Sequence, residues 1–283
     1  MKTLLSILFT ITICSATRAQ SADKVLARVK YNFTHVRDTN QRNNPYTETM
    51  LLVIGKNASI FTSLTSLERN LDLPKARQAP GAPFKPINPT DIYFFAKENK
   101  LISRERFMNA YYLIDEANQK INWKIAKDTI TISGIKCRKA TTYFKGRNWI
   151  AWFAPELPFQ SGPWKLNGLP GLIIQANDDK NEVIFEFAGI DNLKKENLKP
   201  EELELSKIYE KSFFYNPEIA LQKDAKATNR AEFDKILELY RQDPTGFVSA
   251  ATGTPKNRVF MGSSMTGVSH NITNNPIELP EKK

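Results

Sequence analysis

The residues able to do chemistry are few in this sequence. The cysteines are Cys14 and Cys137, and the histidines are His35 and His270. A metal ion needs donors clustered at short spacings, which these residues lack, so neither a metal site nor a cofactor is predicted. Cys137 falls within a predicted strand and not at a helix N-terminus that would lower its pKa. The sequence therefore favours a buried structural cysteine, and a hydrolase or thiol enzyme centred on Cys137 is the alternative.

Two pairs of neighbouring acids are the remaining candidates for acid-base chemistry. Asp178-Asp179 lies within Asn-Asp-Asp-Lys-Asn, residues whose side chains stabilise turns, so a hairpin turn explains it. Glu201-Glu202 precedes a charged amphipathic stretch and indicates a solvated face. The Gly-x-Ser-x-Gly pattern of serine hydrolases is absent. The acids thus predict structure and not catalysis.

Aromatic side chains are concentrated in one short interval and accompany an arginine. On the concave face of a curved sheet such residues would form a pocket for an apolar or amphiphilic ligand. The alternative is that they fill the core beneath a covering helix. The candidate ligand-binding residues are Arg147, Trp149, Trp152, Phe153, Phe159 and Trp164.

The elements that must position these residues are predicted to be strands. Short runs of β-branched and aromatic residues are separated by turn formers, including residues 97–100 and 145–148. Residues 149–153 are apolar on both faces, which predicts a central strand covered on each side. The fold class is therefore all-β: a curved antiparallel meander forming a half or open barrel, with a C-terminal helix. The predicted strands are 25–33, 49–54, 58–64, 92–96, 101–107, 110–114, 121–125, 129–133, 135–144, 149–153, 172–174 and 182–187.

The rest of the chain is predicted to be loop, helix and tail. Five prolines between residues 73 and 89 predict an extended surface loop. Asn216-Pro217-Glu218 has the cap, proline and acid of a helix start, and residues 233–240 carry an apolar stripe. Beyond residue 243 the sequence is polar and lacks apolar periodicity. We expect a single β-rich domain over residues 20–242, including the helix, and an irregular tail over 243–283.

The first 19 residues have the pattern of an export signal: Lys2, an apolar run, and small residues ending at Ala19. Their removal takes Lys2 and Arg18, so the net charge falls from +10 to +8. No transmembrane segment is expected after cleavage. The remaining positive charges are scattered, which speaks against a nucleic-acid partner. The expected location is outside the cytoplasm.

The string Gly168-Leu169-Pro170-Gly171-Leu172-Ile173 resembles the signature of the GLPGLI family, exported proteins of the Bacteroidota without an assigned activity. Its context agrees: Gly134, Cys137, Gly146-Arg147, the tryptophan strand, Gly162-Pro163-Trp164 and a final Asn275-Pro276-Ile277-Glu278. The resemblance implies export to the periplasm or the exterior of a Gram-negative bacterium and association with outer-membrane transport receptors. It supplies no catalytic residues. The order of strands and turns is also similar to half-barrel lipid and lipoprotein carriers of the periplasm.

For the hexapeptide itself the residue types predict a structural role. The two glycines allow backbone angles or close approaches that a side chain forbids, and the apolar residues after Gly171 fill the core. The leading hypothesis is an exported, non-enzymatic binding module that takes an apolar or amphiphilic ligand, or a partner segment, on the concave face. A structural or assembly factor at the outer membrane is a further alternative.

Overall fold

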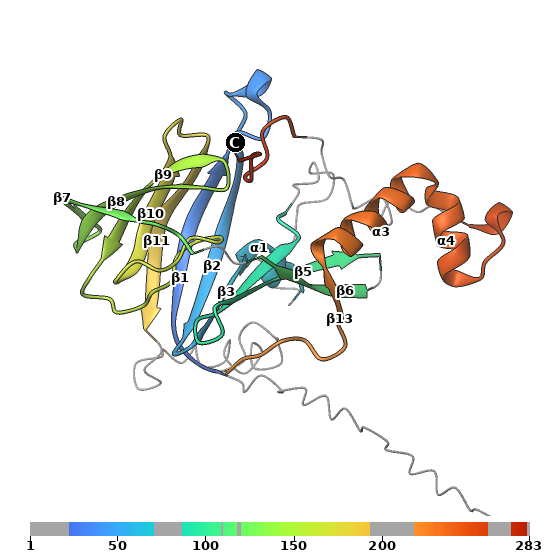
Figure 1. Ribbon diagram of the computed structural model, residues 1–283, viewed down its shortest axis with the longest axis horizontal. Helices are drawn as coiled ribbons and strands as arrows, with labels where there is room; N and C mark the ends of the chain where they lie inside the picture. Colours follow the sequence, from blue (N-terminus) through green and yellow to red (C-terminus); the bar gives the residue numbers. More distant parts are fainter. Residues whose placement is uncertain are drawn as a thin grey trace, which may run out of the picture.

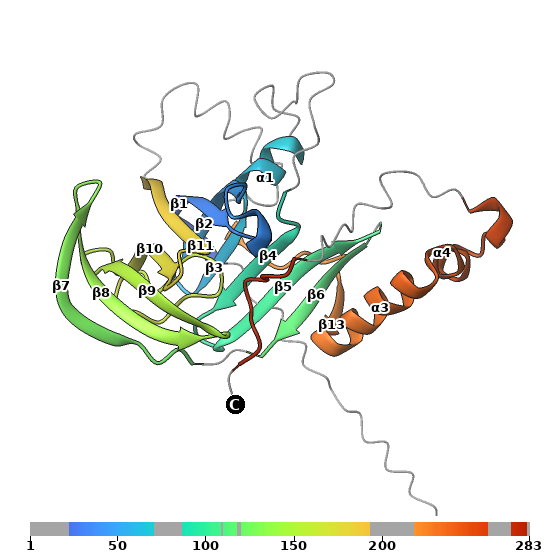
Figure 2. The same ribbon diagram turned by 90° about the horizontal axis from the view of Figure 1, so that it is seen from above.

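The computed structural model describes residues 23–70, 87–108, 110–117, 120–192, 218–259 and 273–281. The expected export signal and most of the proline-rich stretch lie outside these ranges. Within them, thirteen strands form one sheet, in the order β13-β6-β5-β4-β3-β2-β1-β11-β10-β9-β8-β7, with β12 beside β1. All neighbours pair antiparallel except β13 and β6, which are parallel. The sheet bends into an arc and stays open (Figures 1 and 2). The predicted fold class is confirmed.

Most predicted strands are present with bounds shifted by a few residues. The strands are β1 Asp23–His35, β2 Tyr46–Gly55, β3 Ala58–Ser63, β4 Thr90–Phe95, β5 Lys100–Phe107, β6 Ala110–Glu116, β7 Lys124–Ile132, β8 Ile135–Phe144, β9 Arg147–Ala154, β10 Leu172–Asp178, β11 Val183–Asn192, β12 Glu218–Ile219 and β13 Lys226–Asn229. Residues 121–125 and 129–133, predicted as two strands, contribute to one, β7, whose pairing with β8 shifts register between Ile125 and Thr129.

Two-residue turns connect the strands that carry the predicted tryptophan cluster. Ser133-Gly134 joins β7 to β8 and Lys145-Gly146 joins β8 to β9, and all four residues have positive φ. Such turns match the right-handed twist of paired strands and favour glycine at the second position. The predicted turn over 145–148 is therefore shorter, and Arg147 is the first residue of β9.

The concave face of the sheet is filled by the chain's own residues 155–171. Trp164, Leu166 and Leu169 from this segment belong to the main apolar core, together with inward residues of β1–β5 and β8–β11. The backbone N–H of Ile173 donates to the Ser161 carbonyl, and the Trp123 indole donates to that of Asn167. The expected cover was a helix; an irregular segment provides it instead.

The convex face is covered only in part. Over β2–β5 a second core contains Leu64 and Leu67 of α1 (Leu64–Asn70) and Ile219 of β12. Ile150 and Trp152 of β9 remain half-buried. The prediction that this strand is covered on both sides is therefore wrong for its outer face.

The C-terminal helices differ from the prediction in their positions. Glu218 and Ile219 form β12, and α3 (Arg230–Gln242) begins after Asn229, whose side chain accepts from the N–H of Glu232. Phe233 and Leu237 pack against Phe107 and Ile114 of the sheet. The segment expected to be irregular contains α4 (Pro244–Thr252), which follows the cap Asp243. Short 3-10 helices are η1 (Thr39–Gln41) and η4 (Lys256–Arg258).

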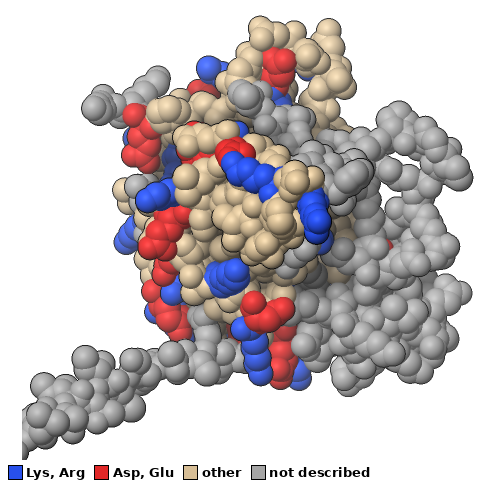
Figure 3. All heavy atoms as spheres, turned by 90° about the vertical axis from the view of Figure 1, so that its right-hand side faces the viewer, with Lys and Arg blue, Asp and Glu red and all other residues tan. Residues whose placement is uncertain are grey.

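The helix pair extends to one side of the sheet (Figure 1). Figure 3 shows this side, where charged residues of both signs surround an uncharged area. The residues of α4 carry no charge. None of the helices in the described ranges has the length and apolar character needed to span a membrane.

Candidate functional site

Three of the predicted ligand-binding aromatics lie in the core. Trp149, Phe153 and Trp164 are 1%, 0% and 8% exposed. The ring centroids of Trp149 and Trp164 are 5.5 Å apart. Between the covering segment and the sheet, beside Trp164, a hollow of about 10 Å³ remains, the space of roughly one water molecule. These aromatics therefore stabilise the concave face by filling it.

The other two aromatics are half-buried and lie apart from one another. Trp152 is on β9, with the Lys139 ammonium 5.9 Å from the centroid of its ring. Phe159 belongs to the covering segment. It lines a hollow of about 370 Å³. The predicted ligand-binding set is thus divided among the core, the outer face and this hollow.

The hollow lies where the β2–β3 turn, the end of β4 and residues 158–161 approach one another. Its apolar surface comes from Leu26, which is 44% exposed, and from Ile54, Ala58, Phe94 and Phe159. Polar groups stand among them. The polar lining residues are Lys56, Asn57, Gln160 and Ser161.

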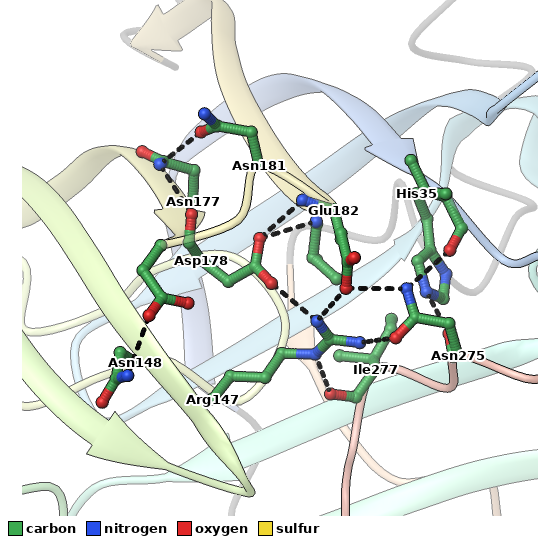
Figure 4. Close-up of polar contacts among 12 residues, drawn as sticks. His35, Arg147, Asn148, Asn177, Asp178, Asn181, Glu182, Asn275 and Ile277 are labelled. Atoms are coloured by element: carbon green, nitrogen blue, oxygen red, sulfur yellow. Dashed lines mark hydrogen bonds and ion pairs between the residues drawn. The ribbon is translucent and has the colours of Figure 1, made fainter. Parts of the chain in front are cut away.

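The sixth predicted residue, Arg147, is at the opposite end of the strands and is 3% exposed. Each of its five N–H donors has a partner within the protein, and Figure 4 shows the contacts with Asp178, Glu182, Asn275 and Ile277. Nη1 donates to Asp178 at 2.6 Å and to Glu182 at 3.4 Å. Nε and Nη2 donate to residues 275–277 of the C-terminal segment. Arg147 thus has no free donor for a ligand.

The acids around Arg147 are held by the β10–β11 turn. Asp178 Oδ1 accepts from the backbone N–H groups of Glu182 and Val183, at 2.7 and 3.0 Å, and its Oδ2 faces Arg147. The turn interpretation of Asp178 agrees with this geometry, but the ion pair was not predicted. Burial raises the pKa of Glu182, yet hydrogen bonds from Arg42 and Arg147 outweigh it and hold that pKa below its usual range.

His35, considered above as a metal donor, joins the same cluster. Its Nε2 lies 2.7 Å from the carbonyl oxygen of Asn275, which an Nε2–H tautomer can reach as donor. Burial lowers the pKa of His35 to about 4, against a smaller opposing effect of the Asn275 hydrogen bond. Within the described ranges, His, Cys, Asp and Glu form no group of three able to hold a metal ion.

A neutral buried histidine makes stability depend on pH. His35 is protonated below about pH 6.5 in the unfolded chain, but only below about pH 4 in the folded chain. The folded state therefore loses stability as the pH falls from 6.5 to 4. The difference amounts to about 3 kcal/mol. We expect His35→Gln, which keeps a donor toward Asn275, to lower the slope of unfolding free energy against pH between 6.5 and 4. Equal slopes in urea titrations of both proteins would contradict this.

The hexapeptide has the predicted structural role in its geometry. Leu169, Leu172 and Ile173 are 1% exposed or less, whereas Gly168 and Pro170 are exposed. Gly171 has φ +151° and approaches the end of β9 closely: a Cβ built on it would lie 2.2 Å from the carbonyl oxygen of Ala154.

Cys137 lies in the middle of β8 and is 1% exposed. Burial raises the pKa of its thiol, with a weaker opposing effect from a backbone hydrogen bond. A raised pKa disfavours the thiolate, the form that attacks as a nucleophile, and such an environment is typical of a structural cysteine.

Sequence reasoning missed several charged residues at the Arg147 end. Glu182 and Lys165 were not singled out, and Glu278 was named only as part of the family resemblance. Lys165 is 7% exposed and its Nζ lies 2.6 Å from Glu278. The available signal was a lysine between Trp164 and Leu166, since a charge within an apolar run is buried only when paired.

No protein-family model and no curated protein matches the sequence. Among solved structures, two crystal forms of PNGF-II are similar over 75% of this chain. The TM-score is 0.48 in both comparisons, and the sequence identities are 14% and 13%. The chain spans 32% of the length of the PNGF-II chain.

Proposed function

We propose that this protein is a non-enzymatic binding module of the cell envelope that takes an apolar or amphiphilic ligand. The ligand occupies the hollow lined by Phe159, Leu26 and Phe94, beside the β2–β3 turn. The observation that carries the proposal is a hollow of about 370 Å³ lined by the exposed Leu26 and the half-buried Phe94 and Phe159. Small-molecule sites typically enclose roughly 300 to 1,000 Å³ and are mostly apolar with a few polar groups.

The polar lining defines the ligand further. Lys56 is the charged residue of the lining, and Asn57, Gln160 and Ser161 are neutral. An apolar body with an anionic head would place the body on Phe159 and Leu26 and the head beside Lys56. An anionic amphiphile is therefore the class of ligand that suits the hollow.

The export signal expected over residues 1–19 and the resemblance to the GLPGLI family support a location in the periplasm or beyond. Association with outer-membrane transport receptors remains part of the proposal on the same ground. A carrier that delivers its ligand to such a receptor would combine ligand binding with receptor association.

The test uses 8-anilinonaphthalene-1-sulfonate, an apolar dye with an anionic head, titrated by fluorescence into the folded protein. Phe159→Asp introduces charge into the hollow and should weaken binding by about tenfold or more, since each 1.4 kcal/mol is tenfold. The matched control is Leu239→Asp on α3, where the side chain is 49% exposed and lies outside the hollow. Equal dye affinity in the two variants and the unaltered protein would reject the hollow as the site.

A further inference from the structure

The C-terminal segment, residues 273–281, is held mainly by side-chain contacts and not as a strand of the sheet. Its two backbone hydrogen bonds to the body of the protein join Asn275 to the carbonyl of Arg37 and Leu279 to that of Lys145. In both ribbon views it lies beside the sheet without joining it (Figures 1 and 2). The segment is therefore docked as a peptide would be.

Asn274, at the start of the segment, is bound through its side chain. Its Oδ1 accepts from the backbone N–H of Thr39 at 2.8 Å, and its Nδ2 donates to Asp38 at 2.8 Å. Both amide groups are used, with donor and acceptor in opposite roles. An aspartate here would lack the Nδ2 donor, in contacts that are exposed to solvent.

Asn275 is also bound through its side chain and is 4% exposed. Its Oδ1 accepts from Arg147 at 2.7 Å, and its Nδ2 donates to the Val36 carbonyl at 2.7 Å and to Glu182 at 3.1 Å. An aspartate here would place an anionic oxygen against two acceptors. Because the carboxylate and the two acceptors are buried and no donor lies between them, that arrangement is strongly unfavourable.

Residues 276–278 are bound through two backbone carbonyls, an apolar contact and one ion-paired carboxylate. Arg147 donates to the carbonyls of Pro276 and Ile277, at 2.7 and 2.8 Å. Ile277 packs against the main core. The Glu278 carboxylate lies 2.6 Å from Lys165 and 3.4 Å from Lys145. Five consecutive residues thus meet complementary groups.

The groups that contact the segment belong to other parts of the chain. Asp178 and Glu182 orient the Arg147 guanidinium from the β10–β11 turn, and the backbone holds Asp178 independently of the segment. His35 and the Val36 carbonyl belong to the end of β1 and the residue after it. A preorganised site loses less free energy on ordering when it binds a ligand.

We propose that the cluster of groups around Arg147 is a peptide-recognition site for an extended segment of the sequence Asn-Asn-Pro-Ile-Glu. The chain's own C-terminal segment is its occupant in cis, and the same sequence supplied in trans binds in its place. This site is at the opposite end of the strands from the hollow and is independent of the proposed function.

The experiment starts from the full-length folded protein with a protease site inserted between residues 259 and 273. After cleavage, the released segment is challenged with a labelled synthetic peptide of residues 273–281, and binding is followed by fluorescence polarisation. We expect the cut protein to keep its fold by circular dichroism and to exchange its segment for the peptide saturably. The uncut protein should bind the peptide far more weakly, because its own segment is present at a high effective concentration.

Two competitor peptides show whether binding depends on the sequence of the peptide or is non-specific. Asn275→Asp should compete about a hundredfold less well, because it leaves buried acceptors facing each other. Glu281→Gln alters an exposed residue and should compete as well as the original. Equal competition by both peptides would overturn the proposal, as would a cut protein that neither exchanges its segment over days nor rebinds peptide at millimolar concentration.

Discussion

Gly171→Val should destabilise the protein by roughly 3 to 6 kcal/mol, the largest effect expected of a single substitution in the hexapeptide. Two causes act together. Gly171 has φ +151°, a backbone conformation that side chains with a Cβ rarely adopt, and its Cβ position lies 2.2 Å from the Ala154 oxygen. The atom that a Cβ would meet belongs to the backbone of Ala154, and Ala154 pairs with Leu172 of β10. Relief would therefore require separating β9 from the covering segment.

The measurement is urea unfolding, with the midpoint shifted and the slope unchanged. Gly168→Ala is the matched control, since Gly168 also has positive φ, +84°, but nothing lies within 4 Å of its Cβ position. It should cost about 1 to 2 kcal/mol, the penalty of the left-handed conformation alone. Equal losses in the two variants would mean that the approach to Ala154 contributes nothing. If Gly171→Val does not fold, Gly171→Ala gives the same comparison.

The strands could be predicted because their signals are local. Glycines with positive φ in the turns after β7 and β8 set the hairpin connections, and alternating apolar residues set the faces. Local signals failed where a distant contact decided the outcome. Asn216-Pro217-Glu218 has the residues of a helix start, but Ile219 is 1% exposed and pairs with Asp23 of β1. The same type of signal at Asp243-Pro244 does begin a helix.

The candidate site was predicted less well than the fold, for a related reason. The residue types predicted that aromatics near Arg147 lie on the concave side, but not what fills that side. The filling segment, residues 155–171, has no periodicity that would reveal its path. Arg147 was assigned to ligand binding because its partners were unknown: Asp178 and Asn275 are 31 and 128 residues away. A buried arginine with distant partners cannot be recognised from spacing.

The two ends of the strands differ in what their surfaces offer. At the end near Phe159, apolar groups face an open hollow. At the end near Arg147, charged and amide groups are satisfied by the C-terminal segment. Unpaired charge is costly when buried, so the Arg147 end depends on the C-terminal segment for its stability. The hollow at the Phe159 end can remain without a ligand, because its lining is mostly apolar.

Arg147→Met should therefore destabilise the protein by about 3 to 5 kcal/mol, the usual cost of breaking a buried ion pair. Its partners are buried as well: the side chains of Asp178 and Glu182 are 1% and 4% exposed. The substitution also leaves the Pro276 and Ile277 carbonyls without their donor. Hydrogen exchange at Leu279, whose N–H donates to Lys145, should become faster as the segment loosens.

Two further variants show whether the charge or the packing is responsible. Arg42→Met removes another arginine from Glu182, at 2.6 Å but 55% exposed, and should cost less than about 1 kcal/mol. Adding Asp178→Asn to Arg147→Met keeps the acceptor for the Glu182 and Val183 N–H groups while removing the unpaired charge. This pair should recover at least about 1 kcal/mol of the loss. No recovery, together with an equal loss in Arg42→Met, would show that the buried charges do not determine the stability of this end.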